Sequence, residues 1–127
     1  MSGNPSPLSL NAAALLAARD PSCLIETDAF MLLDVRKPLA RQVSGFELAG
    51  VIWRHPFAAA HWKAEFSARR LAVFCVHGHE VSQAVAGYLR DEGVAALYVE
   101  GGFEALRMGG WPVAALDGAE QQDGSDA

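Results

Sequence analysis

The sequence predicts an α/β fold in which a parallel sheet is covered on both faces by helices. Two observations carry this prediction: short continuous apolar runs alternate with segments of helical periodicity, and polar residues begin where each apolar run stops. Continuous apolar runs are typical of strands buried on both faces, and their alternation with helices is typical of parallel sheets. Such sheets bind ligands at the carboxyl ends of their strands, so we expect a functional site there.

The first half of the chain combines capping residues, apolar runs and one helix-starting proline. Pro38 fits the first turn of a helix, where its missing N–H costs nothing, and Ser9 or Asn11 is a suitable N-cap. The predicted elements, in chain order, are a helix from the cap to about Arg19, a strand over 30–33, a helix over 37–43, a strand over 50–53 and a helix over 57–68.

The second half repeats the alternation, with glycines at the turns. Gly93 is predicted to end a helix in the left-handed conformation, and Gly101-Gly102 forms the turn into the last helix. The predicted elements are a strand over 71–74, a helix over 81–90, a strand over 96–99 and a helix over 103–108. The polar residues expected to meet at the carboxyl edge of the sheet are Asp34, Arg54, Cys75 and Glu100.

Length and composition favour one globular domain. The chain has 127 residues, of which 51% are hydrophobic, enough for a single core. We expect the domain to cover residues 9–116. Residues 1–8 are expected to form a flexible leader, and residues 117–127 an acidic disordered tail, because they contain few large apolar side chains.

Several classes of protein are disfavoured by the composition. The formal net charge of −5 argues against a nucleic-acid-binding surface. The sequence has no apolar run long enough for a membrane span and no secretory signal, so no membrane partner is expected. The two cysteines, Cys23 and Cys75, do not form a framework of the secreted type, and a reducing cytoplasmic location fits best. Cys23 is interpreted as a bystander, with a resolving role as the alternative.

The strongest candidate for chemistry is Cys75, which stands between a predicted strand and a predicted helix. A helix N-terminus presents unpaired N–H groups and a partial positive charge, and a curled loop adds further donors. These groups stabilise a thiolate. We therefore expect the pKa of Cys75 to lie below that of a free thiol, and the residue to act as a nucleophile.

Two other interpretations of this segment stay open. A cysteine that ends an apolar strand is often only a small buried hydrophobe. Cys75, His77 and His79 also form a Cys-x-His-x-His pattern, to which the distant His55 or His61 could add a ligand. This spacing is not a usual zinc pattern, so no metal site is predicted.

Five segments, in this order, resemble the rhodanese-like sulfurtransferase domain, and together they span most of the chain from Ser9 to Val113. The segments are Asp34-Val35-Arg36, Ala49-Gly50-Val51-Ile52, Cys75-Val76-His77-Gly78, the stretch from Tyr88 to Phe103, and Gly110-Trp111-Pro112-Val113. Val51 departs from the family, which has alanine there. Segments 52–56 and 75–83 further resemble rhodanese domains found with chromate-resistance proteins.

The resemblance implies a central parallel sheet of four to five strands flanked by helices, and a sulfur transfer in two halves. Cys75 would attack the outer sulfur of a small donor, thiosulfate or a persulfide, and the Cys75 persulfide would pass its sulfur to a thiol acceptor, which could be a protein. Neither a metal nor an organic cofactor is implied. The implied active-site loop consists of Val76, His77, Gly78, His79, Glu80 and Val81.

The same resemblance implies a role for the ion pair after the first central strand. Asp34 and Arg36 would brace the loop, with a plain structural ion pair as the alternative.

Many family members carry Arg or Lys in the loop, whereas this chain has Glu80. A carboxylate near the thiol raises its pKa and repels thiosulfate, which favours a persulfide donor. His77 and His79 would supply partial positive charge near neutral pH.

A cysteine in this position suggests three classes of function. An active sulfurtransferase is preferred, and a catalytically silent rhodanese-fold module for binding or for redox and sulfur sensing is the alternative. A cysteine phosphatase, the third class, needs Cys-x5-Arg to grip phosphate with the arginine fork. The sixth residue after Cys75 is Val81, which disfavours that class.

Overall fold

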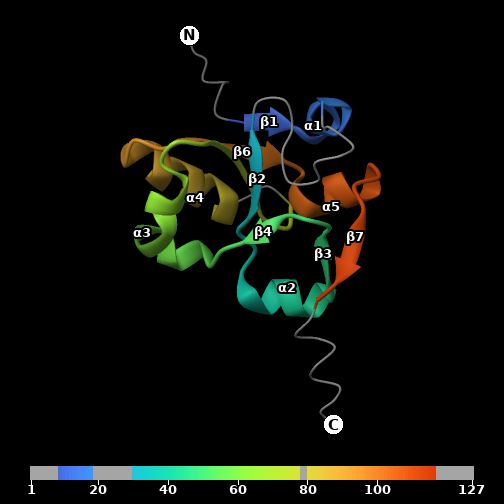
Figure 1. Cartoon of the computed structure of the whole chain (residues 1–127). Coiled ribbons are helices and arrows are strands. Elements are labelled where there is room, and N and C mark those ends of the chain that lie inside the picture. Colours follow the sequence, from blue (N-terminus) through green and yellow to red (C-terminus); the bar gives the residue numbers. More distant parts are fainter. Residues whose placement is uncertain (1–8, 19–29, 78–79, 117–127) are drawn as a thin grey trace.

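The computed structural model describes residues 9–18, 30–77 and 80–116. The predicted leader (1–8), the predicted tail (117–127), Cys23, Gly78 and His79 lie outside these ranges. Within them, strands and helices alternate along the chain as the sequence predicts, except that two strands follow each other over 46–53. Figure 1 shows the elements in the order in which the chain visits them.

A five-stranded parallel sheet forms the centre of the molecule, which confirms the predicted fold class. Its strands, in spatial order, are β1 (Ser9–Asn11), β6 (Ala95–Glu100), β5 (Arg70–Phe74), β2 (Met31–Asp34) and β4 (Ile52–Trp53). β5 is the middle strand, and it pairs with β2 from Leu71 opposite Met31 to Phe74 opposite Asp34. The side chains of β2 are all buried, as expected of a strand covered on both faces.

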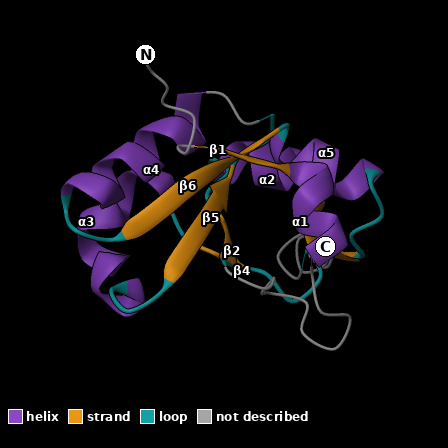
Figure 2. Cartoon of the chain, turned by 90° about the horizontal axis from the view of Figure 1, so that it is seen from above, coloured by secondary structure: helices purple, strands orange, loops and turns teal. Residues whose placement is uncertain are grey.

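Helices cover both faces of this sheet (Figure 2). Leu33 and Val73 pack on the side of the helices α3 and α4, while Leu32 and Ala72 pack on the side of α1 and α5, because successive strand residues point to opposite faces. The bounds of these helices are Ala12–Ala18 for α1, Ala59–Trp62 for α3, Glu80–Asp91 for α4 and Gly102–Met108 for α5. The remaining helix, α2 (Pro38–Ser44), follows β2 at the carboxyl end of the sheet.

A second, two-stranded antiparallel sheet was not predicted. It pairs β3 (Phe46–Leu48) with β7 (Val113–Ala115). The backbone N–H of Leu116 donates to the carbonyl oxygen of Gly45 at 3.1 Å, which extends this contact to the end of α2. The small sheet therefore fixes the C-terminal end of α2 to the body of the domain.

The structure selects one of the two predicted caps for the first helix and corrects one later helix. Ser9 lies in β1, and Asn11 Oδ1 caps α1 by accepting from the N–H of Ala13 at 2.7 Å. The helix expected over 57–68 is divided into a 3-10 turn η2 (Pro56–Ala58), the single turn α3 and a second 3-10 turn η3 (Lys63–Phe66). Burial of Trp62 and Phe66 governs this stretch, and a short isolated helix has little stability of its own.

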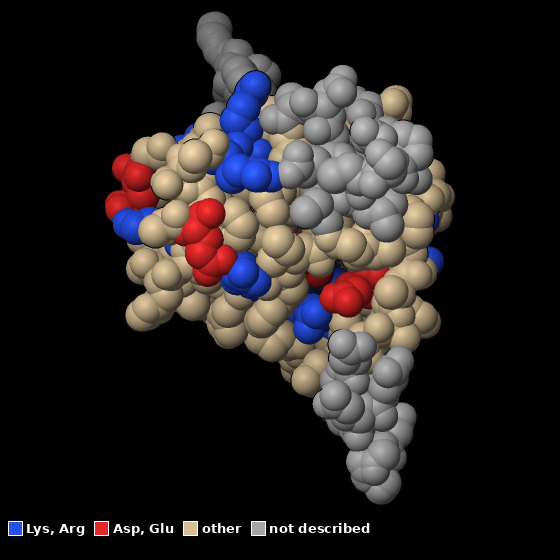
Figure 3. All heavy atoms as spheres, viewed as in Figure 1, with Lys and Arg blue, Asp and Glu red and all other residues tan. Residues whose placement is uncertain are grey.

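Charged side chains of both signs lie near one another on the face shown in Figure 3. Among the surface ion pairs are Arg54 with Glu65 at 2.6 Å and Arg41 with Glu47 at 2.8 Å. No helix in the described ranges combines the length and the apolar character needed to cross a bilayer.

Candidate active site

Cys75 directly follows β5, the middle strand of the sheet, and is 6% exposed. The sulfur therefore lies at the carboxyl end of a parallel sheet, the usual position of a ligand site. The helix α4 begins at Glu80, so only a short loop separates the sulfur from a helix N-terminus. This arrangement of strand, loop and helix is the one that the sequence predicts.

The N-terminus of α5 holds the first part of this loop through two backbone hydrogen bonds. The N–H of Phe103 donates to the carbonyl oxygen of Cys75 at 2.7 Å, and that of Glu104 donates to Val76 at 3.1 Å. In a planar trans peptide the following N–H points opposite to the carbonyl. The N–H groups of Val76 and His77 are therefore directed away from α5.

Ser82 contacts the sulfur directly. Its hydroxyl oxygen lies 3.3 Å from Cys75 Sγ, and the residue is fully buried on α4. A neutral thiol donates this hydrogen bond, whereas a thiolate accepts it, because a hydroxyl can act as donor or acceptor. Ser82 can thus stabilise the charged form of Cys75 without moving.

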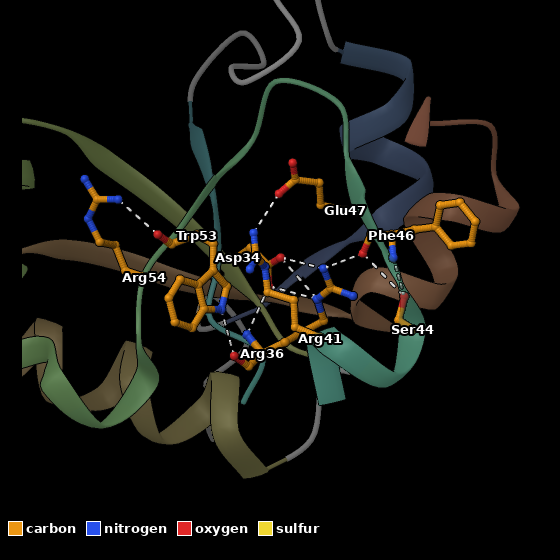
Figure 4. Close-up of polar contacts among 8 residues, drawn as sticks. All are labelled: Asp34, Arg36, Arg41, Ser44, Phe46, Glu47, Trp53 and Arg54. Carbon is orange, nitrogen blue, oxygen red and sulfur yellow. Dashed lines mark hydrogen bonds and ion pairs between the residues drawn. The ribbon is translucent and has the colours of Figure 1, made fainter. Parts of the chain in front are cut away.

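Asp34 and Arg36 form a buried ion pair at the end of β2 (Figure 4). The guanidinium donates to both carboxylate oxygens, from Nε to Oδ1 at 3.0 Å and from Nη2 to Oδ2 at 2.8 Å. Nη2 also donates to the carbonyl oxygen of Phe46 at 3.0 Å. Two parallel bonds to one carboxylate give a charge pair both strength and a defined orientation.

This ion pair reaches the Cys75 loop through an aromatic ring. Arg36 Cζ lies 3.9 Å from the centroid of Phe103, and the N–H of Phe103 holds the carbonyl group of Cys75. A guanidinium over a ring face is attracted by the ring quadrupole. The geometry fits a bracing role for Asp34 and Arg36 that acts through Phe103, and the role itself stays a prediction.

An open pocket of about 470 Å³ lies in front of Cys75, within the usual range for small-molecule sites. Its residues come from the start of α2, from the loop and from the start of α4. They are Lys37, Ala40, Cys75, Val76, His77, Glu80 and Val81.

The structure brings together all four of the predicted loop residues that it describes. Val76, His77, Glu80 and Val81 line the same pocket as Cys75, while Gly78 and His79 lie outside the described residues. The other polar residues at the strand ends have partners elsewhere. Arg54 binds Glu65, and Glu100 accepts a hydrogen bond from Ser9 at 2.7 Å.

Sequence reasoning missed Ser82 as a site residue, and Lys37 and Ala40 as residues of the pocket. The buried side of α4 consists of Ser82, Val85, Ala86 and Leu89. A serine on an otherwise apolar stripe, seven residues after a candidate nucleophile, is the signal that could have identified Ser82. Lys37 and Ala40 gave no signal, because only the fold brings α2 to the loop.

No group of three or more potential metal ligands is found among the described His, Cys, Asp and Glu residues. His55 accepts a hydrogen bond from the backbone N–H of Phe57 at 3.1 Å and belongs to the turn before α3 rather than to the pocket. The pattern Cys75-x-His77-x-His79 includes a residue outside the described ranges.

Comparison with solved structures identifies the fold. A rhodanese-related protein from Thermoplasma volcanium is 29% identical, with a TM-score of 0.65 over 84% of this chain and 96% of that protein. A rhodanese-like domain protein from Staphylococcus aureus is 21% identical, with a TM-score of 0.61 over 77% of this chain and 89% of its own. The chain is therefore a rhodanese-like domain by fold, with Cys75 in the loop that the resemblance assigns to the nucleophile.

Other comparisons define how far this identification reaches. A Rhodopseudomonas palustris protein of unknown function, described as a possible tyrosine phosphatase, is 21% identical, with a TM-score of 0.67 over 84% of this chain and 83% of its own. No protein-family model matches the chain, and no curated protein matches its sequence. The resemblance to chromate-associated rhodanese domains stays a prediction.

Proposed function

We propose that this domain is a sulfurtransferase that carries sulfane sulfur as a persulfide on Cys75. The observation that carries the proposal is the position of the Cys75 sulfur, which lies at the end of the middle strand, 3.3 Å from the Ser82 hydroxyl, and on the wall of an open pocket. A fixed hydroxyl and oriented backbone donors stabilise negative charge on a reacting sulfur.

The proposed reaction has two displacements at sulfur. In the first, the Cys75 thiolate attacks the outer sulfur of a donor R–S–SH. The S–S bond of the donor breaks, R–S⁻ leaves with the electron pair, and Cys75–S–SH forms. In the second, the thiolate of an acceptor attacks the outer sulfur of Cys75–S–SH, which releases the Cys75 thiolate and forms the acceptor persulfide. No net oxidation occurs, so no redox partner is required.

A phosphatase is a weaker proposal, although one structural neighbour is described as a possible tyrosine phosphatase. Phosphate recognition of that type uses an arginine six residues after the cysteine. Val81 occupies that position and lines the pocket with its apolar side chain. The alternative of a catalytically silent binding or sensing module is an outcome of the experiments below.

Intact-mass spectrometry tests the proposal. After incubation with a sulfane-sulfur donor, the protein should gain the mass of one sulfur atom and lose it again with an added thiol. Cys75→Ser should abolish the gain, and Cys23→Ser should retain it. If only Cys23→Ser abolished the gain, Cys23 rather than Cys75 would carry the sulfur. A protein that gains no mass with any donor would favour the silent module.

Alkylation with iodoacetamide as a function of pH tests the environment of the thiol. We expect the pKa of Cys75 to lie below about 8.5, the value of a free thiol, because of the helix N-terminus and the loop amides. Ser82→Ala should raise this pKa, since the thiolate loses a hydrogen-bond donor. A thiol that titrates at or above the free value would indicate a structural cysteine.

A further inference from the structure

The pocket in front of Cys75 carries one charge of each sign. Lys37 lies on the α2 side, and Glu80 lies at the first position of α4. Both residues are exposed. In the described part of the chain, neither makes an ion pair or a side-chain hydrogen bond with another residue. Both charges are thus available to a ligand that lies over the sulfur.

The rest of the pocket lining is mainly apolar. Ala40, Val76 and Val81 line the pocket together with Cys75, and His77 is the one further polar residue of the lining. The pocket therefore offers a cation, an anion and a short apolar floor around a nucleophile. A ligand that satisfies all three features carries a carboxylate, an ammonium group and a compact carbon skeleton that bears sulfur.

We propose that the sulfur donor is a small zwitterionic persulfide of the α-amino acid type, with its carboxylate at Lys37 and its ammonium group at Glu80. This inference rests on the proposed sulfurtransferase function and names the donor of the same site. The Cys75 thiolate attacks the outer sulfur of the donor persulfide, the S–S bond breaks, and the amino-acid thiolate leaves. Cys75 then holds the persulfide, and the electron count is unchanged.

The same two charges should make thiosulfate a poorer ligand of this pocket than a zwitterion. Thiosulfate carries two negative charges and no cationic group, so its attraction to Lys37 is opposed by repulsion from Glu80. A zwitterion makes two favourable contacts in the same space. Charge complementarity of this kind sets specificity more than it sets overall affinity.

The experiment compares the loading rate of Cys75 for a matched series of donors. The probes are the persulfides of cysteine, 3-mercaptopropionate, cysteamine and 2-mercaptoethanol, together with thiosulfate. The cysteine persulfide carries both charges, and the 2-mercaptoethanol persulfide carries neither. The 3-mercaptopropionate persulfide carries only the carboxylate, and the cysteamine persulfide only the ammonium group. Thiosulfate carries a double negative charge. Loading is followed by intact mass at equal donor concentration. The cysteine persulfide should load fastest, by about two- to fivefold for each charged contact, the range of a partly exposed ion pair.

Two charge-removing variants assign these contacts. Lys37→Gln should reduce the cysteine persulfide rate to that of the cysteamine persulfide, and Glu80→Gln should reduce it to that of the 3-mercaptopropionate persulfide. Glu80→Gln should also accelerate loading from thiosulfate. The matched controls are Lys63→Gln and Glu92→Gln, a lysine and a glutamate that bind each other outside this pocket. Both controls should keep the donor ranking of the parent.

The outcomes separate the two proposals. Equal loading from all four persulfides, or a ranking unchanged in both pocket variants, would overturn the assignment of a zwitterionic donor and leave the sulfurtransferase intact. Failure of Cys75 to load from any donor would overturn the sulfurtransferase itself. A thiosulfate rate above that of the cysteine persulfide in the parent protein would also contradict the donor assignment.

Discussion

The two helices that border the Cys75 pocket are attached to the domain in different ways. α4 buries four residues against the sheet, including Ser82 beside the sulfur. α2 has no buried residue, and two of its apolar side chains, Leu39 and Val43, are 70% and 79% exposed. One wall of the pocket is therefore part of the hydrophobic core, and the other is not.

The attachment of α2 comes from groups at and beyond its ends. Arg36, which precedes it, is buried with Asp34. Gly45, which follows it, has φ +76° and accepts a hydrogen bond from the N–H of Leu116 at 3.1 Å, and Arg41 binds Glu47 at 2.8 Å. Core packing therefore fixes Cys75 and its hydroxyl partner Ser82, whereas the wall that carries Lys37 depends on a few polar contacts.

The largest effect is expected from breaking the buried pair that precedes α2. Asp34→Ala leaves the Arg36 guanidinium buried without its carboxylate, which should cost about 3–5 kcal/mol of unfolding free energy. Urea unfolding measures this loss. The double replacement Asp34→Leu with Arg36→Met should be less destabilising than Asp34→Ala, because it leaves no unpaired charge. The reverse order would show that the pair is not what anchors this region.

A matched pair of leucine truncations tests the comparison directly. Leu89→Ala in α4 removes a fully buried side chain and should cost about 2–5 kcal/mol. Leu39→Ala in α2 removes an exposed one and should change stability by no more than about 0.5 kcal/mol. Chemical denaturation of both variants provides the measurement. A large loss for Leu39→Ala would show that α2 packs against the domain in solution.

Two glycine replacements should have opposite signs. Gly45→Ala places a side chain at positive φ, with no atom within 4 Å of the new Cβ, so only backbone strain opposes it, about 1–2 kcal/mol. Gly87→Ala lies inside α4, where the nearest contact is an ordinary 3.7 Å, and should stabilise the protein by about 0.5–1 kcal/mol. Thermal melts measure both stability changes. Two changes of the same sign would contradict the backbone conformations assigned to Gly45 and Gly87.

The smallest effect is expected from the ion pair between Lys63 and Glu92, which lies away from the pocket. The hydrogen bond to Glu92 raises the pKa of Lys63 above its ordinary value of 10.5. A raised pKa contributes stability below the ordinary value, and this contribution is lost as pH rises through the higher folded-state value. Lys63→Met should therefore melt slightly below the parent at pH 8, and the difference should vanish as pH rises through the folded-state pKa of Lys63. A difference in melting temperature that grows at high pH would contradict the pairing of Lys63 with Glu92.

The sequence predicted the sheet and the position of Cys75 between a strand and a helix because both depend on local patterns. The runs before Asp34 and Cys75 are continuous and apolar, and the helix after Glu80 has clear periodicity. Pairing of β3 with β7 joins three-residue strands from distant parts of the chain, and such short segments carry no periodic signal. The prediction of a single helix over 57–68 was wrong because tertiary packing, rather than propensity, decides the conformation of short helical stretches.

The candidate site was predicted unevenly for the same reason. Cys75 and Glu80 follow from the strand, loop and helix around them. Lys37 lines the same pocket as Cys75 only because β2 lies next to β5 in the sheet, an arrangement that a single sequence does not specify. Ser82 could have been found, since a polar residue on a buried stripe requires a hydrogen-bond partner.

The hydrogen bonds from α5 to the Cys75 loop have a consequence for the order in which the protein matures. A growing chain is made from its N-terminus, so Cys75 and the whole of α4 are synthesised before Phe103 and Glu104. Until α5 docks, the carbonyl groups of Cys75 and Val76 lack the two donors that orient them. The backbone of the Cys75 loop therefore reaches its final orientation only after α5 has been made.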